Sequence, residues 1–217
     1  MNTIELFSGT KSFSKVMAAN GHSTLTYDNS MQFQPDVCKD ILTINEIPRA
    51  DLLWASPPCT TFSVASISHY WTDGKPKNDK AMLGIEILTK GIELIATSQP
   101  TWWFIENPRG MMRKVIDEIF SRYGLTPIRH TVTYCQYGAT VQKPTDIWTN
   151  ATWWTPKPKC SPGASCHERA SRGARTGTQG IYNAAWEKGR GGSAMERGRI
   201  PPALFEEILS QMPSGEV

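Results

Sequence analysis

One cysteine stands at a point in the chain where its thiol could act as a nucleophile. Cys59 follows a short apolar run over residues 52–55 and the turn Ser56-Pro57-Pro58. That turn must end a strand, because proline cannot donate to the hydrogen-bond ladder of a sheet. A free cysteine is commonly a small buried hydrophobic residue. A thiol held just beyond a strand, outside regular structure, is instead placed for nucleophilic chemistry.

A second apolar run ends in the same way and offers a carboxyl group. Residues 102–105 are followed by Glu106-Asn107-Pro108, so a polar side chain again stands at a proline-terminated strand end. An isolated glutamate is commonly a charged surface residue. If the two strands are neighbours, however, Cys59 and Glu106 share the crevice at the carboxyl edge of the sheet, where open α/β sheets hold their ligands.

The beginning of the chain has the pattern of a nucleotide-binding sheet. A strand is predicted over residues 3–7, then a turn at Ser8-Gly9-Thr10 and a helix that ends at Asn20-Gly21. Such a turn presents backbone N–H groups to a nucleotide-like ligand. A second predicted strand ends at Asp28, and an acidic residue ~20 positions beyond the first glycine turn commonly binds the ribose hydroxyls. An ordinary turn aspartate is the alternative interpretation.

Taken together, these motifs resemble the DNA (cytosine-5) methyltransferase family. Pro57-Pro58-Cys59 matches the family's Pro-Cys nucleophile motif, and Glu106-Asn107 matches its Glu-Asn-Val motif with proline in place of valine. Phe7-Ser8-Gly9-Thr10-Lys11 matches F-x-G-x-G, with lysine replacing the second glycine. Residues 199–204 resemble the closing motif that returns the last helix beside the first strand. The motifs appear in the family's order over residues 7–208.

The resemblance implies an α/β, Rossmann-like methyltransferase fold that depends on S-adenosylmethionine, and double-stranded DNA as the substrate. Cys59 would add to C6 of a cytosine while Glu106, with Asn107 beside it, activates N3. C5 would then take the methyl group, and a base would remove the C5 proton before Cys59 leaves. Attack at C6 is unfavourable unless N3 gains a proton or a hydrogen bond. The cytosine must also be flipped, because C6 is unreachable in the base stack.

The resemblance also assigns residues to the cofactor. The first loop would embrace the methionine part of S-adenosylmethionine, Asp28 would bind the ribose, and the pair Asp40-Ile41 would bracket the adenine, with Asp40 accepting from its amino group. The full set of expected cofactor residues is Phe7, Ser8, Gly9, Thr10, Asp28, Asp40, Ile41 and Pro57.

Two segments are expected to meet DNA. Residues 60–80 form a long polar connection with three lysines, which the resemblance makes a mobile loop that closes over DNA, with Ser63 as a contact. His69, Tyr70 and Trp71 in this loop either stack against nucleic acid or pin the loop to the body. Apolar residues at helical spacing then predict a helix that packs into the core through Met82, Ile85, Leu88, Ile92 and Ile95.

The family's Gln-x-Arg-x-Arg motif, which contacts the base and its phosphate, is incomplete. Residues 142–146 read Gln-Lys-Pro-Thr-Asp, so Gln142 is retained while Pro144 and Asp146 occupy the arginine positions. Lys143, or an arginine from elsewhere, would have to substitute, or the base contact differs.

The charge of the chain is unevenly distributed. Residues 151–199 carry nine basic and three acidic side chains, a net charge of +6, whereas the whole chain has +3. A basic, glycine-rich segment indicates a phosphate-backbone partner, with Arg172 and Arg175 as candidate DNA contacts. A solvated loop is the alternative. The segment also holds Cys160, Cys166 and His167, which could bind a structural zinc if Cys135 or His130 joins them.

Length and cysteine content set the remaining expectations. The 217 residues fit one α/β domain with a small appendage. We expect a catalytic domain over residues 1–150, a DNA-recognition segment over 151–196 and a returning carboxyl-terminal helix over 197–217. Five cysteines and no apolar leader indicate a reducing compartment. We therefore expect a soluble monomer without a membrane span, in a bacterial or phage-infected cytoplasm.

Other functions stay open at the level of sequence. Lys11, Pro144 and Asp146 depart from the family pattern, which would suit a non-catalytic DNA-binding protein that keeps the fold. The same chemistry on RNA, or with a modified donor whose acidic group faces Arg197 or Arg199, is a further alternative. The short recognition segment would suit relaxed specificity, of the kind that a phage or a restriction-modification system carries.

Overall fold

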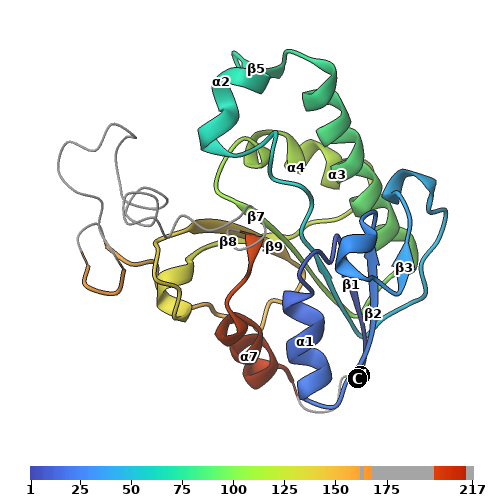
Figure 1. Cartoon of the computed structure of the whole chain (residues 1–217), viewed down its shortest axis with the longest axis vertical. Coiled ribbons are helices and arrows are strands. Elements are labelled where there is room, and N and C mark those ends of the chain that lie inside the picture. The colour runs from blue at the N-terminus through green and yellow to red at the C-terminus, as the bar shows by residue number, and fades with distance from the viewer. Residues whose placement is uncertain (162–163, 168–197, 214–217) are drawn as a thin grey trace.

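The computed structural model describes residues 1–161, 164–167 and 198–213, and its centre is one mixed sheet (Figure 1). The seven strands run in the order β3-β2-β1-β4-β7-β9-β8. Their bounds are β1 (Asn2–Leu6), β2 (Ser23–Asp28), β3 (Val37–Cys38), β4 (Leu52–Ala55), β7 (Trp102–Pro108), β8 (Ile128–Thr133) and β9 (Pro144–Thr149). The first five are parallel to their neighbours, whereas β9 is antiparallel to both β7 and β8.

Helices cover both faces of the sheet. The longer ones are α1 (Ser12–Ala19), α3 (Asp79–Ser98), α4 (Met112–Arg122) and α7 (Pro202–Gln211). Helices α3 and α4 pack on one face, around Leu53 and Ile105, while α1 and α7 pack on the other, around Trp54 and Phe104 (Figure 1). Strand β4 is apolar on both faces, as is typical of parallel strands buried between helix layers. The expected α/β fold, with a largely parallel sheet between two helix layers, is confirmed.

The strand order of the sheet reverses between β1 and β4. From β1 the chain proceeds to β2 and β3 on one side and then returns to β4 on the other. Loops that leave the carboxyl ends of β1 and β4 therefore turn in opposite directions, and open α/β sheets bind ligands in the crevice between such loops. The first loop and the Pro-Pro-Cys turn both begin at this place.

The segment over residues 60–80 contains more regular structure than its polar composition predicts. It forms η3 (Val64–Ser66), α2 (Ile67–Tyr70) and a small hairpin of β5 (Trp71–Thr72) and β6 (Lys75–Pro76). Tyr70 and Trp71 are buried, and the Trp71 indole donates to the Thr61 carbonyl at 2.6 Å. These two rings therefore pin the segment to the body. The expectation for Met82 is wrong, because its side chain is 55% exposed at the start of α3.

A buried carboxyl group joins the first strand to the first helix. Glu5 of β1 accepts hydrogen bonds from the Phe13 and Ser14 backbone N–H groups, at 3.3 and 3.0 Å, and from the Ser14 hydroxyl at 2.6 Å. It thus satisfies backbone N–H groups at the start of α1. Lys11, the residue before the helix, makes no side-chain capping hydrogen bond there. Burial raises the pKa of Glu5 to about 7, although these hydrogen bonds act in the opposite direction.

The stability of the protein is expected to fall with pH because of Glu5. Its pKa is about 7 in the folded chain against an ordinary 4.5, so the folded state binds the proton more tightly in that interval. The stabilisation is complete below pH 4.5 and is lost as the pH rises through 7, a change of about 3 kcal/mol. Denaturant unfolding over this range should show a flatter pH profile for Glu5→Gln than for the native chain. Equal slopes would contradict the prediction.

No helix within the described ranges is long and apolar enough to cross a lipid bilayer.

Candidate active site

The two proline-terminated strands are neighbours in the sheet. Strands β4 and β7 pair in parallel, with Ala55 opposite Ile105, so their carboxyl ends meet at the same edge. Beyond that register, the Asn107 side-chain amide donates to the Pro57 carbonyl at 2.8 Å, and Asn107 is fully buried. One hydrogen bond therefore fixes the Pro-Pro turn that carries the thiol to the strand that carries Glu106.

The turn that presents Cys59 is fastened from several sides. The Cys59 carbonyl accepts from the N–H groups of Phe62 and Ser63 at 3.0 and 2.9 Å, and the thiol is half-buried. The Met111 N–H donates to the Phe62 carbonyl at 2.7 Å. A Cβ on Gly110 would lie 2.1 Å from that carbonyl oxygen, so only glycine allows the close approach. Ser63, the expected DNA contact, forms a bridge to Gly110 within this packing.

Glu106 is buried next to Tyr134, and Lys143 lies over the ring of that tyrosine. The sequence does not connect either side chain with Glu106. Its carboxyl group is 4% exposed and accepts from the Tyr134 hydroxyl at 2.7 Å. The Lys143 ammonium lies over the Tyr134 ring, 4.9 Å from its centroid. Lys143 was expected to contact DNA, but it is itself buried beside the acid. No local signal could have revealed this grouping, because it depends on the register of β8, β9 and β7.

The first loop contains several residues with positive φ and is fastened to the end of β2. Phe7 and Gly9 have positive φ values of 58° and 45°, and the Gly9 N–H donates to the Asp28 carboxylate at 2.8 Å. Lys11 stands where the family has a second glycine and still adopts the left-handed conformation, with φ 56°. Its ammonium donates to the Gln34 carbonyl, which anchors the strained position. Lys11 therefore occupies a backbone conformation that favours glycine.

The remaining expected cofactor residues surround this loop but already have partners within the chain. Asp28 accepts from Gly9 on one carboxylate oxygen and from the Ser30 N–H on the other, at 2.9 Å. Asp40 accepts from the Leu42 N–H and caps η2 (Ile41–Thr43), in which Ile41 is buried. Each carboxylate oxygen keeps a second lone pair. Contacts of Asp28 with a ribose and of Asp40 with an adenine stay predictions.

The first loop also contains a buried polar atom without a hydrogen-bond partner among the described residues. This atom is the Ser8 hydroxyl oxygen. A buried donor left unpaired is costly, and a polar ligand at the end of β1 would satisfy it. The closing motif reaches the same place, because the Ile200 N–H donates to the Ser12 hydroxyl at 3.3 Å. These residues suit the cofactor that the resemblance implies.

Asp146, at the second arginine position of the motif, serves to hold the sheet. Its buried carboxylate accepts from the Arg113 guanidinium of α4 at 2.9 and 2.5 Å, and from the Thr131 hydroxyl at 2.7 Å. Pro144 pairs with Thr133 at the end of the β8–β9 ladder. Neither position presents a free cation to a base.

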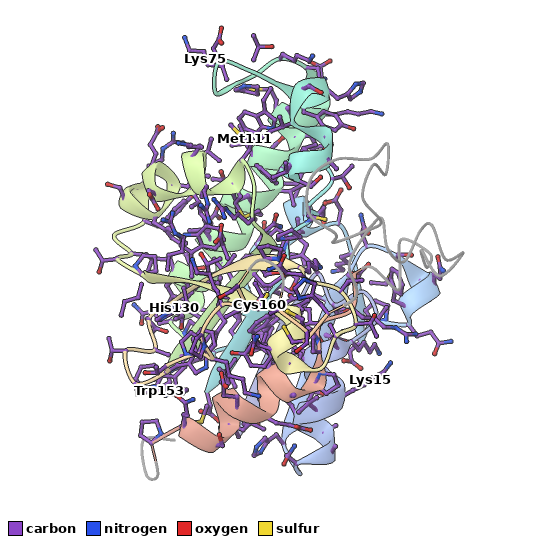
Figure 2. The ribbon with its side chains drawn as sticks, turned by 90° about the vertical axis from the view of Figure 1, so that its left-hand side faces the viewer. Lys15, Lys75, Met111, His130, Trp153 and Cys160 are labelled. Atoms are coloured by element: carbon purple, nitrogen blue, oxygen red, sulfur yellow. The ribbon has the colours of Figure 1, made fainter. Side chains whose placement is uncertain are left out.

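Four potential metal ligands meet at the end of β8. The ligand atoms of Cys135, Cys160, Cys166 and His167 all lie within 4.8 Å of one another (Figure 2, where Cys160 is labelled). Cys135 Sγ lies 3.3 Å from Cys160 Sγ and 3.7 Å from Cys166 Sγ. Sulfur atoms around a tetrahedral zinc with ordinary Zn–S bonds are roughly 3.8 Å apart.

The fourth member of this cluster is Cys135 and not His130, whose ring packs edge-on against Trp154 instead. Burial, and then contact with the Cys160 and Cys166 thiols, raise the pKa of Cys135 to about 12. A thiolate ligand at Cys135 would therefore require a bound cation.

Gln142, an expected DNA contact, donates to Cys160 Sγ at 2.7 Å and so belongs to the edge of the metal cluster. Arg172 and Arg175 lie outside the described residues, as does most of the expected recognition segment.

Comparison with known proteins identifies the family of the chain. Residues 1–123 match the C-5 cytosine-specific DNA methylase family. The chain is 33% identical over 221 residues to the "Probable DNA (cytosine-5)-methyltransferase" of Frog virus 3 (isolate Goorha), which covers 96% of this chain and 99% of that protein.

Two solved structures share the fold at low sequence identity. One is described as a DNA modification methyltransferase encoded within an E. coli prophage; its TM-score is 0.51 at 18% identity, over 74% of this chain and 52% of that one. The other is the Entamoeba histolytica methyltransferase EhMeth, with a TM-score of 0.50 at 14% identity, over 73% of this chain and 56% of that one. The chain thus spans about half the length of these solved structures.

Proposed function

Because this chain belongs to the C-5 cytosine-specific DNA methylase family, we propose that it transfers a methyl group from S-adenosylmethionine to C5 of a cytosine in double-stranded DNA, with Cys59 as nucleophile. The observation that carries the assignment of Cys59 and Glu106 is the hydrogen bond from Asn107 to the Pro57 carbonyl. It holds the thiol-bearing turn to the strand that carries Glu106, which supports a shared site for the two groups.

The chemistry divides between the two side chains. The Cys59 thiolate forms a bond to C6 while Glu106 donates a proton to N3, which neutralises the charge that would otherwise build up on the ring. C5 then becomes nucleophilic, and S-adenosylmethionine, when bound, supplies the electrophilic methyl group. A base removes the C5 proton, the C6–sulfur bond breaks to restore the thiolate, and the N3 proton returns to Glu106. The cytosine has to leave the duplex first.

Binding roles follow from the same edge of the sheet. We assign the cofactor to Phe7, Ser8, Gly9, Thr10, Asp28, Asp40, Ile41 and Pro57. The hydrogen bond from Gly9 to Asp28, the unsatisfied buried Ser8 hydroxyl and the position of Asp40 at the start of η2 support this assignment. Ser63 and the basic segment with Arg172 and Arg175 are proposed to contact DNA. Gln142 and Lys143 would contribute indirectly, because Gln142 donates to Cys160 and Lys143 lies over the ring of Tyr134.

The cellular setting is also a proposal. Five cysteines that form no disulfide support a reducing compartment such as the cytoplasm of an infected cell. The similarity to a protein of Frog virus 3 supports a viral or phage-like gene, with or without a restriction partner. We propose a monomer with the catalytic domain at residues 1–150, the recognition segment at 151–196 and a returning helix at 197–217, of which α7 packs its Phe205 ring on Phe13 of α1.

A methyl-transfer assay with three substrates tests the function. Labelled S-adenosylmethionine should label duplex DNA, and conversion sequencing should place the label on cytosines of a short target sequence. RNA of the same sequence and free cytidine nucleotides should stay unlabelled. Transfer to RNA instead of DNA would favour the RNA alternative, and DNA binding without transfer would favour the non-catalytic one.

We further propose that Cys135, Cys160, Cys166 and His167 bind one structural zinc ion. Three thiols and an imidazole are the ligand type that zinc prefers, and their ligand atoms already lie within 4.8 Å of one another. The residues come from two segments that share little apolar packing, so a metal would hold the Cys160–His167 segment against η4 (Tyr134–Tyr137).

The metal content of purified protein checks this proposal. The native chain should hold about one zinc per molecule, and Cys160→Ser should lose it, because structural sites need all four ligands. Cys38→Ser is the matched control, since Cys38 is another free, half-buried cysteine outside the cluster. A full equivalent of zinc in Cys160→Ser would contradict the assignment.

A further inference from the structure

The short helix η4 contacts two different sites through consecutive side chains. Tyr134 donates to Glu106 in the active site, while Cys135 belongs to the metal cluster. Gln136 then donates to Cys166 Sγ at 3.4 Å, and the Tyr137 hydroxyl donates to Glu207 of α7 at 2.8 Å. A displacement of this helix would therefore move the acid's partner and the cluster together.

The residues directly before β9 repeat the arrangement. Gln142 donates to Cys160 Sγ at 2.7 Å, and the next residue, Lys143, lies over the Tyr134 ring. The Tyr134 N–H donates to the Lys143 carbonyl at 3.3 Å. On the cluster side, the Cys160 N–H donates to the Thr133 hydroxyl at 3.0 Å, directly before Tyr134. Residues at both ends of the β8–β9 connection thus contact Cys160. Thr133 directly precedes Tyr134, and Gln142 directly precedes Lys143.

We infer that the metal centre sets the catalytic geometry of Glu106 by holding Tyr134 in place. The inference rests on the proposed zinc site and on the proposed role of Glu106. A carboxyl group is planar, so a hydrogen bond that fixes Oε1 also fixes the direction of Oε2, the oxygen left to meet the base. Tyr134 is a positioning residue in this scheme, because it acts through Glu106.

The backbone of η4 alone would hold Tyr134 in place only weakly. It is a four-residue 3-10 helix, whose hydrogen-bond geometry is poorer than that of an α-helix. It ends at Gly138, which has a positive φ of 88°. Metal ligation adds the constraint that the short helix lacks, so loss of the metal is expected to free Tyr134 without unfolding the sheet.

A two-by-two comparison of metal and tyrosine tests the inference. Zinc removal should lower kcat by about tenfold to a hundredfold, the size of one hydrogen bond to a charged group, with KM for DNA nearly unchanged. Tyr134→Phe should lose a similar factor with zinc present, and removing zinc from this variant should add little. Tyr137→Phe, on the same helix but directed at Glu207, should keep the full response to zinc. Equal zinc responses in the native chain and Tyr134→Phe would overturn the inference.

A second measurement does not depend on activity. In protein with isotope-labelled tyrosine rings, the Tyr134 signal is identified by its absence from Tyr134→Phe, and it should shift when zinc is removed. A shift in protein that transfers no methyl group would support the metal coupling while removing the proposed function. Normal methyl transfer with no bound zinc, or with an unmoved Tyr134 signal, would overturn the inference and leave the proposed function standing.

Discussion

Replacing Cys59 with alanine is expected to lower methyl transfer by about four orders of magnitude or more, because no other group can form the bond to C6. The fold should be unaffected. The turn is held through the backbone, with the Cys59 carbonyl accepting from Phe62 and Ser63, and these hydrogen bonds do not involve the thiol. Binding of duplex DNA and of S-adenosylmethionine should therefore stay near native values.

Covalent trapping separates this prediction from a general loss of activity. In DNA that contains 5-fluorocytosine, the fluorine at C5 cannot leave as a proton does, so the adduct with the native chain should accumulate as a denaturation-resistant complex. Cys59→Ala should form none, whereas Cys38→Ala, which changes a free cysteine at the end of β3, should form as much as the native chain. A trapped complex with Cys59→Ala would exclude Cys59 as the nucleophile.

The placement of the reacting groups could be predicted because its signals are local. An apolar run followed by proline indicates where a strand stops, and two such stops, at Pro57 and Pro108, predicted one shared edge of the sheet. The pairing of β4 with β7 confirms that neighbourhood. The turn at Gly9 was equally readable, since a glycine between a strand and a helix leaves few conformations for the chain.

The hydrogen bond that Tyr134 donates to Glu106 could not be predicted, because it joins residues that are distant in sequence. Tyr134 meets Glu106 across 28 positions, and only the registers of β7, β8 and β9 bring the two together. The metal cluster shows the same limit. Spacing left Cys135 and His130 as equal candidates for the fourth ligand, although their side chains lie in different environments, Cys135 among thiols and His130 against Trp154.

The polar connection after Cys59 shows why composition alone misleads. Its lysines and glycine predicted an irregular loop, whereas Trp71 packs its ring 6.0 Å from that of Phe62 and donates to the Thr61 carbonyl. Two aromatic side chains are enough to fix a short hairpin when they find a buried partner. Exposed residues at its tip, such as Lys75, extend away from the body (Figure 2).

Loss of the Asp146 carboxylate is expected to cost about 3 kcal/mol of folding free energy in Asp146→Ala. Asp146 is fully buried and accepts from both Arg113 and Thr131, so its removal leaves a cation and a hydroxyl without their acceptor. Urea unfolding measures the change. Glu118→Ala breaks the exposed pair with Arg122 on the same helix, α4, and should cost about 0.5 kcal/mol or less. A cost as small for Asp146 would contradict the prediction.

The double variant Arg113→Met with Asp146→Leu distinguishes pairing from simple packing. Two apolar side chains leave no unpaired charge, so most of the lost stability should return, as is usual when both members of a buried pair are replaced. Strand β9 lies between β7, which carries Glu106, and β8, which leads to Tyr134. If the double variant regains stability but still has a kcat below the native value, the ion pair also fixes the position of β9 beside β7, the strand that carries Glu106. If it regains both, the carboxylate at Asp146 is needed only for folding, and any cationic contact with the target base comes from another part of the chain.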